Sequence, residues 1–158
     1  MNPQKKNVLF VCSAGGHLAQ VLELGDLMKK YNYLIVTEDI EATRPLADHY
    51  NIKFLKPDAK RYSFRFWLNF FSNFFFSLKL ILSFKPSVII TTGSHTAVPM
   101  CILGKMLGKK VIYILSYARV NTKAKSADIL YPIANEFIVQ WESAQKLYPK
   151  SKYFGGIY

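Results

Sequence analysis

The chain has 158 residues, of which 51% are hydrophobic and 20% charged; this composition excludes global disorder and allows a sizeable buried core. Its 21 Lys and Arg against 10 Asp and Glu give a formal charge of +11, which favours nucleic acid, anionic lipid headgroups or phosphorylated substrates as partners. Twelve Phe and two Trp accompany that charge. Because the Phe residues gather in one stretch, we favour a lipid surface over a nucleic-acid duplex.

The two cysteines, Cys12 and Cys101, lie inside apolar runs and not in a spacing that suggests a metal site. We interpret both as buried, reduced thiols of a cytosolic protein. The apolar run 8–12 is too short for the core of a secretory signal, which also indicates a cytoplasmic location. We assign no metal ligand and expect no cofactor.

Short β-like runs alternate with helical stretches, which predicts a parallel α/β sheet of the Rossmann-like class. The sequence shows no internal repeat or low-complexity linker, so we expect a single domain over residues 1–158. In such a sheet, ligands bind at the carboxyl ends of the strands. Strands are expected at 8–12, 33–37, 52–55, 87–92, 110–115 and 137–140, and helices at 18–28, 41–49, 62–84, 93–107 and 142–148.

The expected helix over about 62–84 is unusually aromatic. Three interpretations compete. A transmembrane helix fits the length, but two cations and a polar stripe argue against it. A core helix usually has a narrower apolar face with fewer aromatic residues. An amphipathic helix in the plane of a membrane surface fits best, with part of the same face packing on the domain. We assign the membrane contact to Arg65, Trp67, Phe70, Phe71, Phe74, Phe75 and Leu78.

Two loops at expected strand ends are suited to a phosphorylated ligand. In SAGGH at 13–17, the glycines let a ligand approach the backbone, and the helix start offers free N–H groups to an anion. The loop lacks the G-x-G-x-x-G spacing, so a phosphate or pyrophosphate fits better than a dinucleotide. His17 is a candidate base or phosphate donor; it could instead only satisfy local backbone groups.

The second loop, TTGSHTAVP at 91–99, repeats this arrangement of strand end, glycine and helix start. Ser94 or Thr96 could simply cap the helix. Two such loops at one edge of the sheet nevertheless predict a shared cleft. The residues assigned to the acceptor or its phosphates are Ser13, Gly15, Gly16, Gly93, Ser94, Thr96 and Arg119.

Five segments appear in an order typical of one family: SAGGH and TTGSHTAVP, then SYARV at 116–120, FIVQWE at 137–142 and YPKSKYFGG at 148–156. On these segments the chain resembles, nearly end to end, the Alg14-like family. That family comprises the eukaryotic Alg14 subunit and bacterial subunits of split glycosyltransferases for capsule and exopolysaccharide. The SAGGH loop also resembles its counterpart in the lipid-linked N-acetylglucosaminyltransferases of peptidoglycan synthesis.

The resemblance implies half of a glycosyltransferase B fold, in which two Rossmann-like domains face each other across a cleft. This chain would be the N-terminal, acceptor-side half, and a partner chain would bind the nucleotide-sugar. Eukaryotic relatives have an N-terminal membrane helix, whereas this chain starts almost at its first strand. Attachment to the cytoplasmic face of the membrane would then fall to the helix at 62–84. Many relatives carry an acidic residue where this chain has Leu115.

The implied reaction transfers a sugar, with inversion, from a nucleotide-sugar to a polyprenyl-pyrophosphate-linked saccharide. Gly15, Gly16 and Arg119 would hold the pyrophosphate, and His17 would act as the base. The expected partners are therefore the donor-binding subunit, membrane lipid and this acceptor. The aromatic residues expected at the subunit interface are Trp141, Tyr148, Tyr153 and Phe154; they could equally cover the edge of the sheet.

Two alternatives stay open. One is a stand-alone nucleotide-sugar-dependent enzyme that is complete in 158 residues. The other is a basic Rossmann-like protein that binds nucleic acid, for which aromatic residues should be interleaved with cations. Here the aromatic residues are segregated on one helix face, so we expect no nucleic-acid partner.

Overall fold

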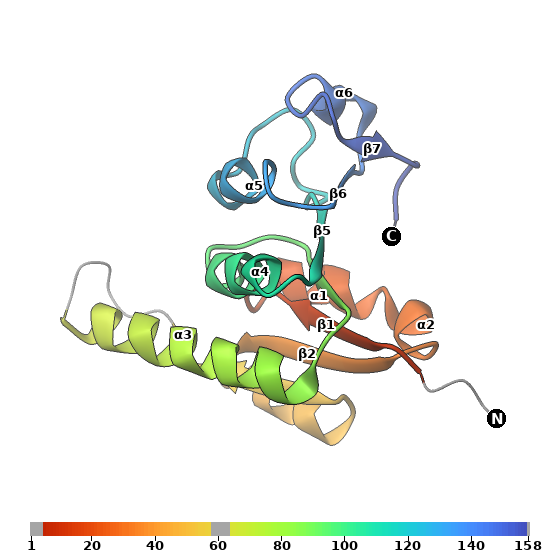
Figure 1. Cartoon of the computed structure of the whole chain (residues 1–158). Helices are drawn as coiled ribbons and strands as arrows, with labels where there is room; N and C mark the ends of the chain where they lie inside the picture. The colour runs from red at the N-terminus through yellow and green to blue at the C-terminus, as the bar shows by residue number, and fades with distance from the viewer. Residues whose placement is uncertain (1–4, 58–63, 158) are drawn as a thin grey trace.

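A computed structural model describes residues 5–57 and 64–157, without the side chains of Arg65 and Phe66. Within these residues, seven parallel strands form one sheet in the order β3-β2-β1-β4-β5-β6-β7 (Figure 1), which confirms the Rossmann-like α/β class. The strands are β1 (Asn7–Val11), β2 (Asn32–Glu38), β3 (Ile52–Leu55), β4 (Val88–Thr91), β5 (Lys110–Ile114), β6 (Glu136–Val139) and β7 (Lys152–Tyr153). The helices are α1 (Gly16–Leu22), α2 (Gly25–Met28), the 3-10 helix η1 (Arg44–Asp48), α3 (Phe64–Phe84), α4 (Ala97–Met106), α5 (Lys125–Leu130) and α6 (Glu142–Gln145).

The order of the strands reverses beside β1. The chain first places β2 and β3 on one side of β1, and then returns to place β4 on its other side. At the carboxyl end of β1, Val11 is in register with Val36 of β2 and with Thr91 of β4. Such a reversal is where open parallel sheets bind ligands. The loops that follow β1 and β4 flank this point.

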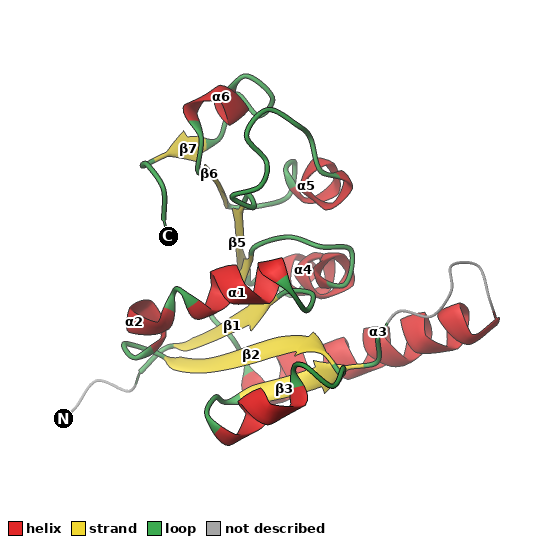
Figure 2. Cartoon of the chain, turned by 180° about the vertical axis from the view of Figure 1, so that it is seen from behind, coloured by secondary structure: helices red, strands yellow, loops and turns green. Residues whose placement is uncertain are grey.

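The core has two layers, one on each face of the sheet. Side chains alternate along β1, as they do in any strand: Leu9 and Val11 belong to the layer shared with α3 and α4, whereas Val8, Phe10 and Cys12 belong to the layer shared with α1 and α2. Figures 1 and 2, drawn from opposite sides, show these helix pairs on the two faces of the sheet. The sheet is therefore covered on both sides, and its carboxyl edge is the natural place for a site.

Three predicted helices are shorter than the sequence suggested or are divided. The stretch 18–28 is divided into α1 and α2, because the chain leaves the helical conformation at Leu24 (φ −81, ψ 17) and Gly25 follows. The stretch 41–49 is reduced to η1, where Pro45 lacks an N–H donor for an α-helix. The predicted helix at 142–148 shortens to α6, and α5 and β7 have no counterpart in the prediction.

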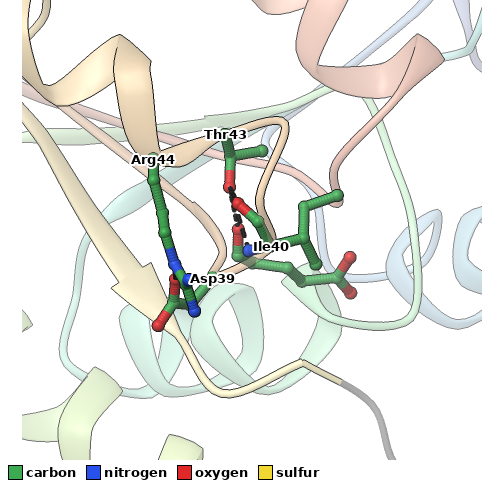
Figure 3. Close-up of polar contacts among 5 residues, drawn as sticks. Asp39, Ile40, Thr43 and Arg44 are labelled. Carbon is green, nitrogen blue, oxygen red and sulfur yellow. Dashed lines mark hydrogen bonds and ion pairs between the residues drawn. The ribbon is translucent and has the colours of Figure 1, made fainter.

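The turn before η1 is fixed by Thr43. Its hydroxyl donates to the backbone oxygens of Glu38 at 2.7 Å and Ile40 at 2.9 Å. The guanidinium of Arg44 lies 2.6 Å from the carboxylate of Asp39 (Figure 3). These bonds hold the chain where β2 ends, so they fix the position of the Glu38 backbone.

Helix α3 is much longer than the strands. Its 21 residues span about 31 Å, whereas the four residues of β4 span about 13 Å. The carboxyl half packs on the core through Ile81 and Ser77. Because α3 leads back into the start of β4, its amino-terminal part extends beyond the carboxyl edge of the sheet (Figure 2). The predicted helix began at residue 62; residues 62 and 63 lie outside the described residues.

Candidate functional site

His17 joins the loop after β1 to the loop after β4. Its Nδ1 lies 2.9 Å from the backbone oxygen of Thr92, and the Thr92 hydroxyl donates to the backbone oxygen of His17, also at 2.9 Å. Since a carbonyl oxygen can only accept, Nδ1 carries the hydrogen. In the neutral ring, Nε2 is then left with the lone pair and can accept a proton.

The environment of His17 favours that neutral ring. Burial lowers the pKa of the imidazole below its usual value, against the opposing effect of the hydrogen bond to Thr92. The positive charge of Arg119 lowers the pKa further. The structure therefore places Arg119 in electrostatic reach of His17, and near pH 7 the ring is a base rather than a cation.

Gly93 provides the space for this arrangement. Its φ of 103° is a conformation that side chains rarely adopt. A Cβ at this position would lie 2.5 Å from the hydroxyl of Tyr113 and 3.3 Å from Cε1 of His17. Gly93 is thus required for the close approach of the two loops, whether or not its backbone also meets a ligand.

Ser94 follows in an unusual conformation, with a φ of 102°. Its N–H donates to Oγ of Ser126 at 3.3 Å, and Ser126 also lies 3.1 Å from the hydroxyl of Tyr113. The hydroxyl of Ser94 is buried and has no partner within the described part of the chain. Strained residues and unpaired buried polar groups are costly, and both concentrate at functional sites.

Glu38 is a component of the site that the sequence analysis missed. One carboxylate oxygen accepts from the Thr96 hydroxyl at 2.5 Å, and the other accepts from the N–H of Ala14 at 3.3 Å. The hydroxyl of Thr96 makes no capping bond to α4. A phosphate could use the Thr96 hydroxyl only if its bond to Glu38 opened. The one signal in the sequence was the position of Glu38 at the end of a predicted strand.

The glycines of the first loop leave open space. Gly15 and Gly16 are exposed, and a Cβ added to either would meet nothing within 4 Å. Ser13 is half-buried at the base of the same loop. Arg119 lies in the exposed loop after β5, where its guanidinium donates weakly, at 3.4 Å, to Thr122.

The predicted membrane residues divide into two groups. Trp67, Phe70, Phe71 and Phe75 are exposed, whereas Phe74 and Leu78 are partly buried against the core, because the body of the protein covers that side of α3. Part of the apolar face of α3 thus packs on the domain at these two residues. The side chain of Arg65 lies outside the described residues.

The polar side of α3 binds the chain itself. Asn73 makes two bonds of 2.9 Å with the backbone of Lys56, and Asn69 donates to the backbone oxygen of Pro57, also at 2.9 Å. By length and composition alone, the stretch Trp67–Phe84 is long and apolar enough to cross a membrane. Polar side chains of this stretch nonetheless form hydrogen bonds with the backbone of the same chain.

The residues predicted to contact a partner subunit differ in their exposure to solvent. Tyr148 is only 1% exposed; its ring packs on Phe137 and its hydroxyl donates to Asp128 at 3.1 Å. It belongs to the core, and its assignment to a surface is wrong. Trp141 is partly buried, whereas Tyr153 and Phe154 are exposed.

Among the described residues, no group of three His, Cys, Asp or Glu side chains is close enough to hold a metal ion.

Comparison with known proteins identifies the family. Residues 60–157 match a family described as "Oligosaccharide biosynthesis protein Alg14 like". The chain is 33% identical to the UDP-N-acetylglucosamine transferase subunit ALG14 of Rattus norvegicus, over 98% of this chain and 84% of that protein. This chain belongs to the Alg14-like family. The subunit of the same name in Schizosaccharomyces pombe is 30% identical, over 97% of this chain and 84% of that protein.

Solved structures share the fold of this Alg14-like chain. MurG of Acinetobacter baumannii superposes with a TM-score of 0.75 at 14% identity, over 96% of this chain and 45% of MurG. The UDP-GlcNAc 2-epimerase of Methanocaldococcus jannaschii has a TM-score of 0.68 at 13% identity, over 94% of this chain and 45% of the epimerase. This chain spans less than half of either protein, as expected for one half of a glycosyltransferase B fold.

The position of Leu115 separates this Alg14-like chain from the acidic pattern expected in its relatives. Leu115 is buried in the core, and its backbone oxygen accepts from the side-chain amide of Gln140 at 2.9 Å. In this chain, Glu38 supplies a carboxylate at the same edge of the sheet.

Proposed function

We propose that this chain is the acceptor-side subunit of a two-chain glycosyltransferase at the cytoplasmic face of a membrane. The enzyme transfers a sugar from a nucleotide-sugar to a polyprenyl-pyrophosphate-linked saccharide in the synthesis of capsule or exopolysaccharide. The relatives are named as subunits of UDP-N-acetylglucosamine transferases, which supports a uridine diphosphate sugar as donor. The observation that carries the proposal is His17, hydrogen-bonded through Nδ1 to Thr92 beside an open glycine loop, at the edge from which α3 extends.

His17 acts as the general base in this proposal. Its Nε2 takes the proton of the acceptor hydroxyl, whose oxygen attacks the anomeric carbon of the donor sugar. The bond from that carbon to the nucleotide phosphate breaks, and the leaving nucleoside diphosphate keeps the electron pair. The lowered pKa supports this role, because only the neutral ring can accept the proton.

The acceptor pyrophosphate lies between the first loop and Arg119. The space above Gly15 and Gly16 admits a phosphate to the backbone, and the guanidinium of Arg119 adds positive charge. Ser13, Gly93, Ser94 and Thr96 line the remaining wall. The carboxylate of Glu38 is satisfied by Ala14 and Thr96, so its bonds hold the wall in place.

Helix α3 attaches the subunit to the membrane in its plane. An exposed stripe recurs every three, four or seven residues along one side of the helix, at Phe64, Leu68, Phe71, Phe75 and Leu82. In the carboxyl half, the side with Ser77 and Ile81 is buried, whereas Trp67 and Phe70 add exposed aromatic rings in the amino-terminal half. Such an exposed apolar surface, together with a formal charge of +11, is typical of a helix that lies on an anionic leaflet. The acceptor headgroup is at the same level.

The donor half comes from the partner chain. Tyr153 and Phe154, exposed near the end of the described residues, are the proposed aromatic contacts, together with the partly buried Trp141. Large exposed aromatic residues are frequent anchors of subunit interfaces. This chain covers 45% of MurG and 45% of the epimerase, so more than half of each of those proteins lies outside the match.

A reconstitution experiment tests the proposal. The chain and a candidate donor-binding subunit are purified separately and mixed on vesicles that contain polyprenyl-pyrophosphate-saccharide and labelled UDP-N-acetylglucosamine. We expect transfer only when both chains are present, and loss of transfer with His17→Ala. Strong transfer by this chain alone would instead identify a stand-alone enzyme.

A further inference from the structure

A pocket opens beside α1, and of its lining residues only Gly16 has been assigned a role so far. It has a volume of about 300 Å³ and lies between α1 and the loop that follows β5. Its lining residues are Gly16, Ala19, Gln20, Glu23 and Tyr117. The first four share one face of α1 and its end, because they recur at helical spacing. Gly16 and Ala19 are small, which leaves room in front of the helix.

Tyr117 forms the aromatic wall of this pocket. Its ring centroid lies 4.7 Å from that of Trp141, with an angle of 48° between the planes. The indole N–H of Trp141 donates to the backbone oxygen of Tyr117 at 2.7 Å. Trp141 therefore supports the ring from one side, and Tyr117 remains 44% exposed. A supported ring of this kind presents an apolar face to a ligand with little loss of conformational freedom.

Gln20 and Glu23 add polar groups beside that ring. The amide nitrogen of Gln20 donates to the hydroxyl of Ser116 at 3.1 Å, which holds the side chain across the pocket floor. Its amide oxygen is shielded from solvent and has no partner within the described residues. A ligand donor that reached it after a small rotation of the amide would relieve that cost. The exposed carboxylate of Glu23 is an acceptor for hydroxyl groups.

We propose that this pocket binds a pyranose ring of the saccharide acceptor, with the apolar face of the sugar on Tyr117 and its hydroxyls on Glu23 and Gln20. The inference rests on the proposed function and names the part of the substrate held here. One aromatic face with an amide and a carboxylate suits a neutral, hydroxyl-rich ring. The five lining residues include no cation, and Glu23 repels phosphate. The pyrophosphate therefore lies towards Arg119.

Saturation-transfer NMR on the isolated chain tests this assignment, with the methyl glycosides of N-acetylglucosamine, glucose and galactose as probes. We expect transfer from the protein to ring protons of at least one glycoside. Tyr117→Ala should reduce it about five-fold or more, Tyr117→Phe should retain it, and Glu23→Gln should weaken it about two-fold, as expected for the loss of a stacked ring and of one hydrogen bond. Tyr153→Ala is the matched control, because Tyr153 is 40% exposed and lies outside the pocket.

Three results would overturn the assignment: no saturation transfer to any glycoside, saturation transfer from Tyr117→Ala as strong as from wild type, or a loss of saturation transfer in Tyr153→Ala equal to that in Tyr117→Ala. If Tyr117→Ala does not fold, the binding of glycosides by Tyr117→Phe and Glu23→Gln still tests the assignment. In the two-chain assay, Tyr117→Ala should raise the KM for the acceptor and leave kcat nearly unchanged. An unchanged KM would contradict the sugar subsite but not the proposed function. If the wild-type pair transfers no sugar, the proposed function is wrong, whereas binding of glycosides measured by NMR would still show that the pocket binds a sugar.

Discussion

Glu38 and Thr96 form a hydrogen bond of 2.5 Å that crosses the sheet from the end of β2 to the loop after β4. The strand between them is β1, and the second carboxylate oxygen of Glu38 accepts from Ala14 in the loop that follows it. One side chain thus ties together three neighbouring loops at the switch point. Because His17 is bonded to Thr92 in the same two loops, Glu38 also determines where the base lies.

Replacing Glu38 should loosen this edge. Glu38→Ala removes both acceptors and leaves the Thr96 hydroxyl and the Ala14 N–H unpaired, at a cost of about 1–3 kcal/mol in the free energy of unfolding. Glu38→Gln keeps one acceptor oxygen and should lose less. Urea denaturation measures both. Glu41→Gln, an exposed residue of the following turn, is the control. A Glu38→Ala variant as stable as wild type would show that the bonds contribute nothing.

His17 should make the stability of the protein depend on pH. Its pKa is lowered by burial in the folded state and returns to about 6.5 on unfolding. The unfolded state therefore binds more protons in the window just below pH 6.5, and stability falls as the pH decreases through it. His17→Asn keeps an N–H for Thr92 but does not titrate. The free energy of unfolding of this variant should therefore depend less on pH in this window than that of wild type.

Denaturation of wild type and of His17→Asn between pH 5 and 8 measures the difference. His49 and His95 are present in both proteins, so their contributions cancel. Parallel stability curves would mean that His17 titrates equally in the folded and unfolded states. The activity of the reconstituted pair should likewise be level near pH 7 and fall only at acid pH, since the base is already neutral at pH 7.

The strands β1 to β6 were predictable from the sequence to within one or two residues, because runs of β-branched and aliphatic residues such as 33–37 and 52–55 predict buried strands. The two-residue strand β7 was not predicted. The loops after β1 and β4 followed from their glycines. The role of Glu38 did not, because its partners depend on the spatial order β2-β1-β4, which is not the order along the chain. Burial of Tyr148 was equally hidden, since α5, against which it packs, has a weak helical pattern.

The exposed stripe of α3, together with the exposed Trp67, should bind membranes. Trp67→Glu with Phe71→Glu changes two side chains that are 48% and 55% exposed; the double variant should fold normally and be released from vesicles that contain phosphatidylglycerol. Co-sedimentation measures binding, and circular dichroism measures folding. Ile81→Glu, at a position 1% exposed, is the contrast, because a charge there should unfold the protein. Unfolding of the double variant would instead show that the stripe is part of the core.

Gly93 should tolerate no side chain. Gly93→Ala combines an unfavourable φ of 103° with a Cβ only 2.5 Å from the Tyr113 hydroxyl. The ring of Tyr113 cannot easily move away, because it is stacked on Phe137 with centroids 4.8 Å apart. We expect a loss of about 1–3 kcal/mol in the free energy of unfolding. Gly108→Ala is the matched control, since its φ is 73° and a Cβ there meets nothing within 4 Å.

A double-mutant cycle separates the two causes of that loss. Tyr113→Phe removes the hydroxyl that the new Cβ would meet and leaves the backbone strain of Gly93→Ala unchanged. If the clash contributes, the double variant should be more stable than the sum of the single losses predicts, with a coupling of about 0.5–3 kcal/mol. Simple additivity, with Gly93→Ala costing no more than Gly108→Ala, would show that only backbone strain is felt. In that case Gly93 would not be needed to let His17 lie close to the second loop.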